Sequence, residues 1–81
     1  MNMREIEFAV KINAPEIEPR FRHAHILEQF DQLPSGQYME LKNDHDPKPL
    51  HYQFMMERKN QFTWEYLEDG PTQWRVAIGK K

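Results

Sequence analysis

The residues best suited to chemistry in this 81-residue chain fall in two places. Arg22 and His23 are adjacent, and later the chain reads Asp44-His45-Asp46. Imidazole and carboxylate groups are ligands for zinc, iron and similar ions, so His23, His45 and Asp44 form a candidate site for a divalent metal ion. Arginine binds a carboxylate or oxyanion with two parallel hydrogen bonds, so Arg22 beside His23 is also a candidate anion site.

Both histidines also have an ordinary structural interpretation. His23 and His25 lie two apart on an expected helix and point to different faces, and no two histidines have the four-residue spacing of a helical chelate. On the structural interpretation, His23 lies at one end of the row of apolar residues that its helix buries. His45 then forms hydrogen bonds within an Asp-rich turn. The sequence leaves these alternatives open.

Catalysis is the weaker hypothesis for these residues. His45 is a possible general base, held by Asp44 or Asp46, and a possible phosphoryl acceptor. Neither reaction has a partner motif in the chain, so we assign no catalytic residue. The chain has no cysteine, which excludes disulfides, thiolate metal sites and sulfur transfer through a persulfide.

Four segments alternate apolar and polar residues with the period of two that is typical of a strand with one buried face. The last two are separated by a Glu-Asp-Gly-Pro turn and therefore predict a hairpin. The expected strands are residues 6–12, 38–43, 62–67 and 74–78.

Two segments between these strands have helical patterns. Residues 19–32 begin with Pro19, which is tolerated at the first helical position, and repeat apolar residues at three- and four-residue spacing. Residues 47–59 follow Asp46, which we expect to cap the helix N-terminus, with Pro47 as its first helical residue. The predicted core consists of Phe8, Val10, Leu27, Phe30, Leu41, Leu50, Phe54, Trp64, Val76 and Ile78.

These elements predict an α/β (α+β) two-layer sandwich in the order β-α-β-α-β-β, with two helices on one face of a four-stranded mixed sheet. The first two strands should be parallel, because a strand, crossover helix and strand in one sheet almost always make a right-handed parallel unit. Both helix N-termini then lie at one edge of the sheet, where open α/β sheets usually bind ligands. We therefore expect Arg22, His23, Asp44 and His45 to share one surface region.

Composition limits the partners of the chain. The net charge is −2 and the charges are mixed, with no basic cluster before Lys80-Lys81, so we expect no nucleic-acid partner. No apolar stretch approaches the roughly 18 residues of a membrane span, and no helix has a basic stripe, so we expect no membrane partner. A chain of this length buries one core, and we expect a single cytoplasmic domain over residues 1–81.

Several motifs carry a resemblance to a known family. They are Arg22-His23 and the stretches 33–36 (Leu-Pro-Ser-Gly), 43–50 (Asn-Asp-His-Asp-Pro-Lys-Pro-Leu), 64–71 (Trp-Glu-Tyr-Leu-Glu-Asp-Gly-Pro) and 74–76 (Trp-Arg-Val). The chain resembles the bacterial domain-of-unknown-function family 2249 over nearly its whole length. The resemblance implies a fold similar to the SirA/TusA sulfur carriers and relatives that occur beside hemerythrin-like or cupin domains, but no activity.

The chain departs from these relatives at two positions. Sulfur carriers of that fold use a Cys-Pro motif where this chain has Asn13-Ala14-Pro15-Glu16. His51 stands where the resembling family more often has an aliphatic residue.

We expect a small binding or accessory module, acting beside metal- or redox-linked proteins, with a ligand site at the helix N-termini. The alternative is a protein interaction module that uses the other face of the sheet. There Glu7, Lys11, Glu40, Lys42, Glu65 and Arg75 should be exposed around Ala9, Leu67 and Ala77. That face suits a partner protein, a neighbouring domain or a second copy of the chain, so the oligomeric state is expected to be a monomer or a weak dimer.

Overall fold

The computed structural model describes residues 6–81. Each predicted strand and helix is present, with ends that differ by a few residues from the sequence pattern, and one short 3-10 turn, Ala14–Glu16, follows the first strand. The elements are β1 (Phe8–Asn13), α1 (Pro19–Asp31), β2 (Tyr38–Asn43), α2 (Lys48–Glu57), β3 (Phe62–Asp69) and β4 (Trp74–Lys80).

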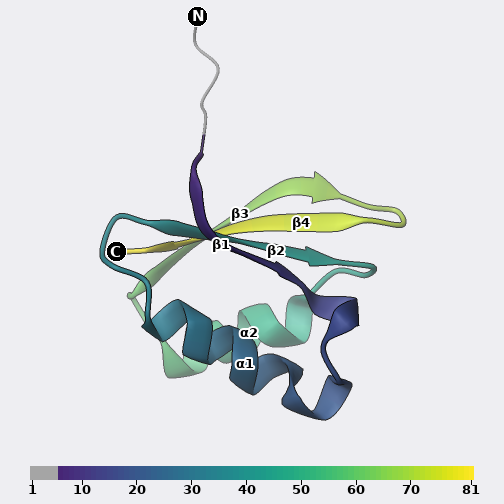
Figure 1. Cartoon of the computed structure of the whole chain (residues 1–81), viewed down its shortest axis with the longest axis horizontal. Helices are drawn as coiled ribbons and strands as arrows, with labels where there is room; N and C mark the ends of the chain where they lie inside the picture. Colours follow the sequence, from purple (N-terminus) through teal and green to yellow (C-terminus); the bar gives the residue numbers. More distant parts are fainter. Residues whose placement is uncertain (1–5) are drawn as a thin grey trace, which may run out of the picture.

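The four strands form one mixed sheet in the spatial order β1-β2-β4-β3. β1 and β2 are parallel, whereas β4 is antiparallel to both β2 and β3. Figure 1 shows α1 and α2 side by side on the same face of this sheet, with the opposite face uncovered. The predicted two-layer arrangement and the parallel first pair of strands are thus confirmed.

The core lies between the helices and the covered face of the sheet. Phe30 of α1 and Phe54 of α2 are fully buried and meet edge to face, with ring centroids 5.1 Å apart. Val10 and Trp64 are half-buried and pack against the core. Of the residues predicted for the core, those buried in it are Leu27, Phe30, Leu41, Leu50, Phe54, Val76 and Ile78; Ile12, Ala14, Ile26, Leu33 and Met39 join them.

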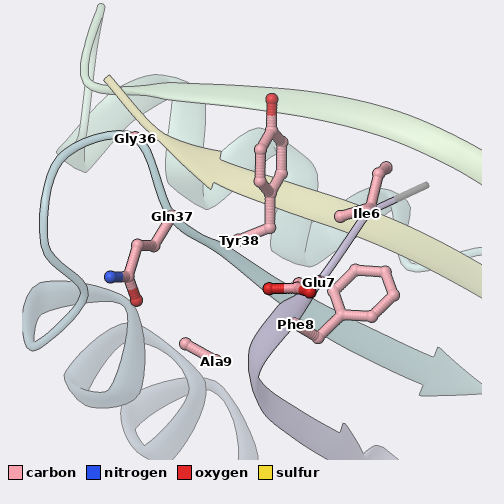
Figure 2. Close-up of a pocket in the computed structure, with 7 residues that line it drawn as sticks. All are labelled: Ile6, Glu7, Phe8, Ala9, Gly36, Gln37 and Tyr38. Carbon is pink, nitrogen blue, oxygen red and sulfur yellow. The ribbon is translucent and has the colours of Figure 1, made fainter. Parts of the chain in front are cut away.

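Phe8 is the exception, and its assignment to the core is wrong. The register between β1 and β2 pairs Phe8 with Tyr38 but Val10 with Met39, so Ala9 is an extra residue in a β-bulge. Val10 shares the covered face with Met39, and the bulge places Phe8 on the uncovered face with Tyr38. Figure 2 shows Phe8 on β1 and the ring of Tyr38 rising from β2 at this end of the sheet.

The uncovered face also differs from the expectation at its centre. Glu40 and Ala77, expected among exposed residues, are buried, with 8 % and 0 % of their surface exposed. Arg75 donates hydrogen bonds from Nε (3.0 Å) and Nη2 (2.7 Å) to Oε2 of Glu40. Ala77 lies between the paired residues Glu40 and Glu65, so its short side chain is shielded by longer ones.

His51 packs on the aromatic side chains of β3. Its ring stacks on Trp64 with centroids 4.2 Å apart and planes within 2° of parallel. Burial is the main influence on this group and lowers the pKa of His51, although the charge of Asp46 acts in the opposite direction. The His51 ring therefore contributes to this position by stacking on an aromatic side chain, as a neutral planar ring can.

The C-terminal end of α1 is held by the rest of the fold. Lys80 of β4 donates from Nζ to the carbonyl oxygens of Phe30 (3.4 Å), Asp31 (3.2 Å) and Leu33 (3.2 Å). Arg58, just after α2, donates two hydrogen bonds of 2.8 Å to the Asp31 carboxylate. These contacts fix the position of α1, and with it the position of Arg22 and His23 near its other end.

Within residues 6–81, the structure contains no helix with the length and apolar character needed to span a membrane.

Candidate functional site

The candidate site lies where β1 and β2 end and the two helices begin. Because these strands are parallel, the first turns of α1 and the loop before α2 meet at one edge of the sheet. A small cavity of about 40 Å³, partly open to solvent, lies between them. Its lining residues are Arg22, His23, Ile26, Asn43, His45, Pro47, Pro49 and Leu50.

Arg22 is fixed by one backbone contact. Its Nη2 donates a hydrogen bond of 2.9 Å to the carbonyl oxygen of Ile17, in the connection between β1 and α1. Its Nε is buried and has no hydrogen-bond partner among the described residues. A buried donor without an acceptor costs free energy, so this guanidinium has an unused capacity for an acceptor such as a carboxylate oxygen.

His23 is oriented by α2. Its Nδ1 lies 2.9 Å from Oε1 of Gln53. The amide nitrogen of Gln53 in turn donates a hydrogen bond of 3.0 Å to the Glu57 carboxylate. That second bond directs the amide oxygen of Gln53 toward His23, so Nδ1 of His23 acts as the donor. Nε2 of His23 has no hydrogen-bond partner within residues 6–81 and remains for a ligand.

His45 has the same arrangement with a different partner. Its Nδ1 lies 2.7 Å from Oδ1 of Asp44, and both side chains are mostly exposed. The hydrogen bond from His45 lowers the pKa of the Asp44 carboxyl group, which is therefore a carboxylate that accepts the Nδ1 proton. Nε2 of His45 likewise has no partner in the described part of the chain.

Asp44 contacts His45 but does not line the cavity. Its backbone N–H donates a hydrogen bond of 2.8 Å to Oδ1 of Asn43. Asn43 is the last residue of β2 and is buried. Asp44 thus orients a site residue and lies outside the cavity itself. Of the predicted residues, the structure brings Arg22, His23 and His45 together around the cavity.

The predicted capping role of Asp46 is wrong. α2 begins at Lys48 with Pro47 in the N-cap position, and no side chain caps it. The N–H of Lys48 already donates a hydrogen bond of 2.8 Å to the backbone oxygen of Asp46. Pro47 and Pro49 have no N–H that a capping side chain could accept. The Asp46 carboxylate instead accepts a hydrogen bond of 2.7 Å from the hydroxyl of Tyr66.

The metal hypothesis gains no support from this geometry. Within residues 6–81, no group of three or more His, Asp or Glu side chains is arranged to hold a metal ion. The cationic side chain of Arg22 in the cavity wall also disfavours a second positive charge. His23, His45 and Asp44 therefore remain a metal site only as a prediction.

Two residues of the site were not found from the sequence. Asn43 lines the cavity, and its polar side chain at an inward-facing position of a strand was the available signal. Gln53 orients His23 across thirty residues of chain, and nothing in the local pattern of α2 distinguishes it from an ordinary helical glutamine.

The fold and site define a two-layer α/β domain with a small polar cavity at the helix N-termini. A model of the family described as "Uncharacterized conserved protein (DUF2249)" matches residues 11–80. The chain belongs to this family. Comparisons with curated proteins and with solved structures find no match, so the similarity to SirA/TusA carriers stays a prediction.

Proposed function

We propose that this chain is a small binding module whose ligand presents a carboxylate, or an oxyanion of similar size, to Arg22, His23 and His45. One observation carries the proposal: these three side chains line the same cavity, and the Nε donor of Arg22 is buried without an acceptor. A bound carboxylate would supply that acceptor and a charge opposite to that of the guanidinium.

The two histidines support the same chemistry. With Nδ1 of each ring held by an oxygen acceptor, protonation occurs at Nε2 and turns it into a second donor for the ligand. A protonated ring can therefore donate to a bound anion from Nε2, whereas a metal ion would require the unprotonated Nε2.

Cavity size limits the part of the ligand that enters. A volume of about 40 Å³ is a few times the roughly 10–15 Å³ that a single water molecule needs, so the pocket has room for a carboxylate group but not for a nucleotide. The donors are side chains, because Pro47 and Pro49 remove N–H groups from the start of α2. The remainder of the ligand lies outside the cavity.

The test is an NMR titration of the protein with formate, acetate and phosphate, with Zn²⁺ as a separate arm. Formate and acetate should shift the signals of Arg22, His23 and His45 in a saturable way. Arg22→Gln should weaken this response about tenfold or more, since it removes the charged donor. Arg20→Gln is the matched control, because Arg20 is exposed and pairs with Glu18.

Three outcomes would overturn the proposal. The first is a set of formate-induced NMR shifts that is spread over the whole surface and not confined to the cavity. The second is an equal loss of formate response in Arg22→Gln and Arg20→Gln. The third is a saturable response to Zn²⁺ alone at His23 and His45. Each result would remove the reason for assigning an anionic ligand to this cavity.

A further inference from the structure

Two residues of the cavity at the helix N-termini present hydrogen-bond donors. The guanidinium of Arg22 has only N–H groups, and its Nε is buried without an acceptor among the described residues. Oδ1 of Asn43 accepts a hydrogen bond of 2.8 Å from the backbone N–H of Asp44, which leaves the Nδ2 group of the same amide as a donor. Neither side chain loses its donor near neutral pH.

The two histidines of the cavity present acceptors when their rings are neutral. Nδ1 of His23 lies 2.9 Å from Oε1 of Gln53, and Nδ1 of His45 lies 2.7 Å from Oδ1 of Asp44. The proton of each neutral ring is therefore on Nδ1, and Nε2 has a lone pair. A carboxylate alone cannot satisfy this lone pair, because its oxygens are acceptors as well.

We propose that the ligand of this cavity is a 2-hydroxycarboxylate. Its carboxylate accepts hydrogen bonds from Arg22 and Asn43, and its hydroxyl donates one to Nε2 of His45. The inference rests on the proposed function, because it assigns a chemical class to the ligand of the same cavity. A hydroxyl on the carbon next to the carboxylate supplies the donor that the neutral imidazole lacks. The ligand then matches both kinds of group in the cavity wall.

His45 is the better placed of the two histidines for the hydroxyl. Its side chain is 61 % exposed, whereas His23 is half-buried. The cavity holds about 40 Å³ and is partly open to solvent, so a carboxylate group occupies most of it. The carboxylate therefore lies inside, beside the buried Nε of Arg22, and the rest of the ligand lies toward the more exposed ring. His45 is thus the residue that determines specificity for the hydroxyl.

Two related classes of ligand fit the cavity less well. A 2-amino acid has an ammonium group next to its carboxylate, and the guanidinium of Arg22 in the cavity wall disfavours a second positive charge. A carboxylate with neither a hydroxyl nor an amine leaves Nε2 of His45 without a donor. Such an acid still binds through Arg22, but with an affinity lower by about fivefold, the typical net contribution of one hydrogen bond.

Glycolate and propionate separate the hydroxyl from the carboxylate, because these anions have the same charge and differ only by a hydroxyl in place of a methyl group. Their affinities can be measured by calorimetry at about pH 8, at which imidazole in water is largely neutral. The wild type should bind glycolate about fivefold more tightly than propionate. In His45→Ala the ratio of the two affinities should fall to about one. His25→Ala changes an exposed histidine of α1 and should keep the wild-type ratio.

The outcomes distinguish this inference from the proposed function. Equal affinities of the wild type for glycolate and propionate would overturn the inference and leave the carboxylate site in place. A preference for glycolate that His45→Ala keeps, or that His25→Ala also loses, would overturn the role of His45. A wild type that binds neither anion would contradict the proposed function, and the inference with it. Glycine, as the 2-amino analogue, should bind no more tightly than propionate, and tighter binding would overturn the assignment of a hydroxyl.

Discussion

The hydroxyl of Tyr66 donates a hydrogen bond of 2.7 Å to the Asp46 carboxylate, and this bond joins β3 to the loop that begins α2. The same loop carries His45, and α2 carries Gln53, which orients His23. Tyr66 and Asp46 therefore contribute to the position of the cavity wall from outside the cavity.

Substitution of Asp46 distinguishes this bond from a helix cap. Asp46→Ala should destabilise the wild type by about 1 kcal/mol, which is typical for loss of a hydrogen bond to a charged acceptor near the surface. In a Tyr66→Phe background the same change should cost close to nothing. Urea unfolding of the four proteins measures both costs, and an equal cost in the two backgrounds would return Asp46 to a capping role.

Titration of Tyr66 provides an independent check on the same contact. Burial is the largest influence that raises the pKa of Tyr66 above its ordinary value of 10.0, and the bond to Asp46 adds to it. Asp46→Asn should therefore lower the pKa of Tyr66, as followed by tyrosinate absorbance. A pKa that does not change would show that the carboxylate has no influence on the phenol.

The covered and uncovered sides of the sheet should respond differently to the truncation of an aromatic ring. Phe54→Ala removes a fully buried ring and should cost about 3–5 kcal/mol, or prevent folding. Phe8→Ala removes a half-buried ring from the uncovered face and should cost about 1 kcal/mol or less in the monomer. Thermal or urea unfolding at low protein concentration makes the comparison. A cost for Phe8 as large as that for Phe54 would place Phe8 back in the core.

The fold has a histidine whose protonation opposes folding. Burial lowers the pKa of His51 below its ordinary value of 6.5, so the unfolded chain binds this proton more readily than the folded one. The contribution of His51 to stability is therefore complete above about pH 6.5 and decreases as the pH falls below it. His51→Gln should flatten this part of the pH profile of unfolding, and His25→Gln, at an exposed position of α1, should not. Identical profiles for wild type and His51→Gln would contradict the lowered pKa.

Lys80 should stabilise the end of α1. Its ammonium group contacts three carbonyl oxygens there and lies 4.9 Å from the centre of the Phe30 ring. Lys80→Met keeps the aliphatic chain and removes the charge, which should cost about 1 kcal/mol, as is typical of a cation at a helix C-terminus. Lys81→Met changes the exposed neighbour and should cost little. Equal unfolding midpoints for all three proteins would show that the contacts contribute nothing.

The architecture could be predicted from the sequence because each of its causes is local or topological. Alternation identified the strands, and the handedness of the crossover placed the start of α1 beside the end of β2. The approach of Arg22 and His23 to His45 follows from these two facts.

The errors arise where one residue changes a pattern. The alternation from Ile6 to Ile12 looks continuous, but the bulge at Ala9 moves Phe8 to the other face. Asp46 before Pro47 has the pattern of a cap, yet Pro49 removes an N–H that a cap would bind. Contacts such as those of Gln53 with His23 and Glu40 with Arg75 depend on side-chain directions in distant segments, which a local pattern does not contain.

The most direct test of the cavity as an anion site is the affinity for formate, measured by calorimetry on the wild type, on Arg22→Gln and on the Arg20→Gln control. Arg22 supplies the charged donor of the proposed site, and its buried Nε has no acceptor among the described residues. We predict saturable binding to the wild type and to Arg20→Gln, and an affinity lower by about tenfold or more in Arg22→Gln. Formate binding that is absent in the wild type would contradict the account, as would affinity that Arg22→Gln leaves unchanged.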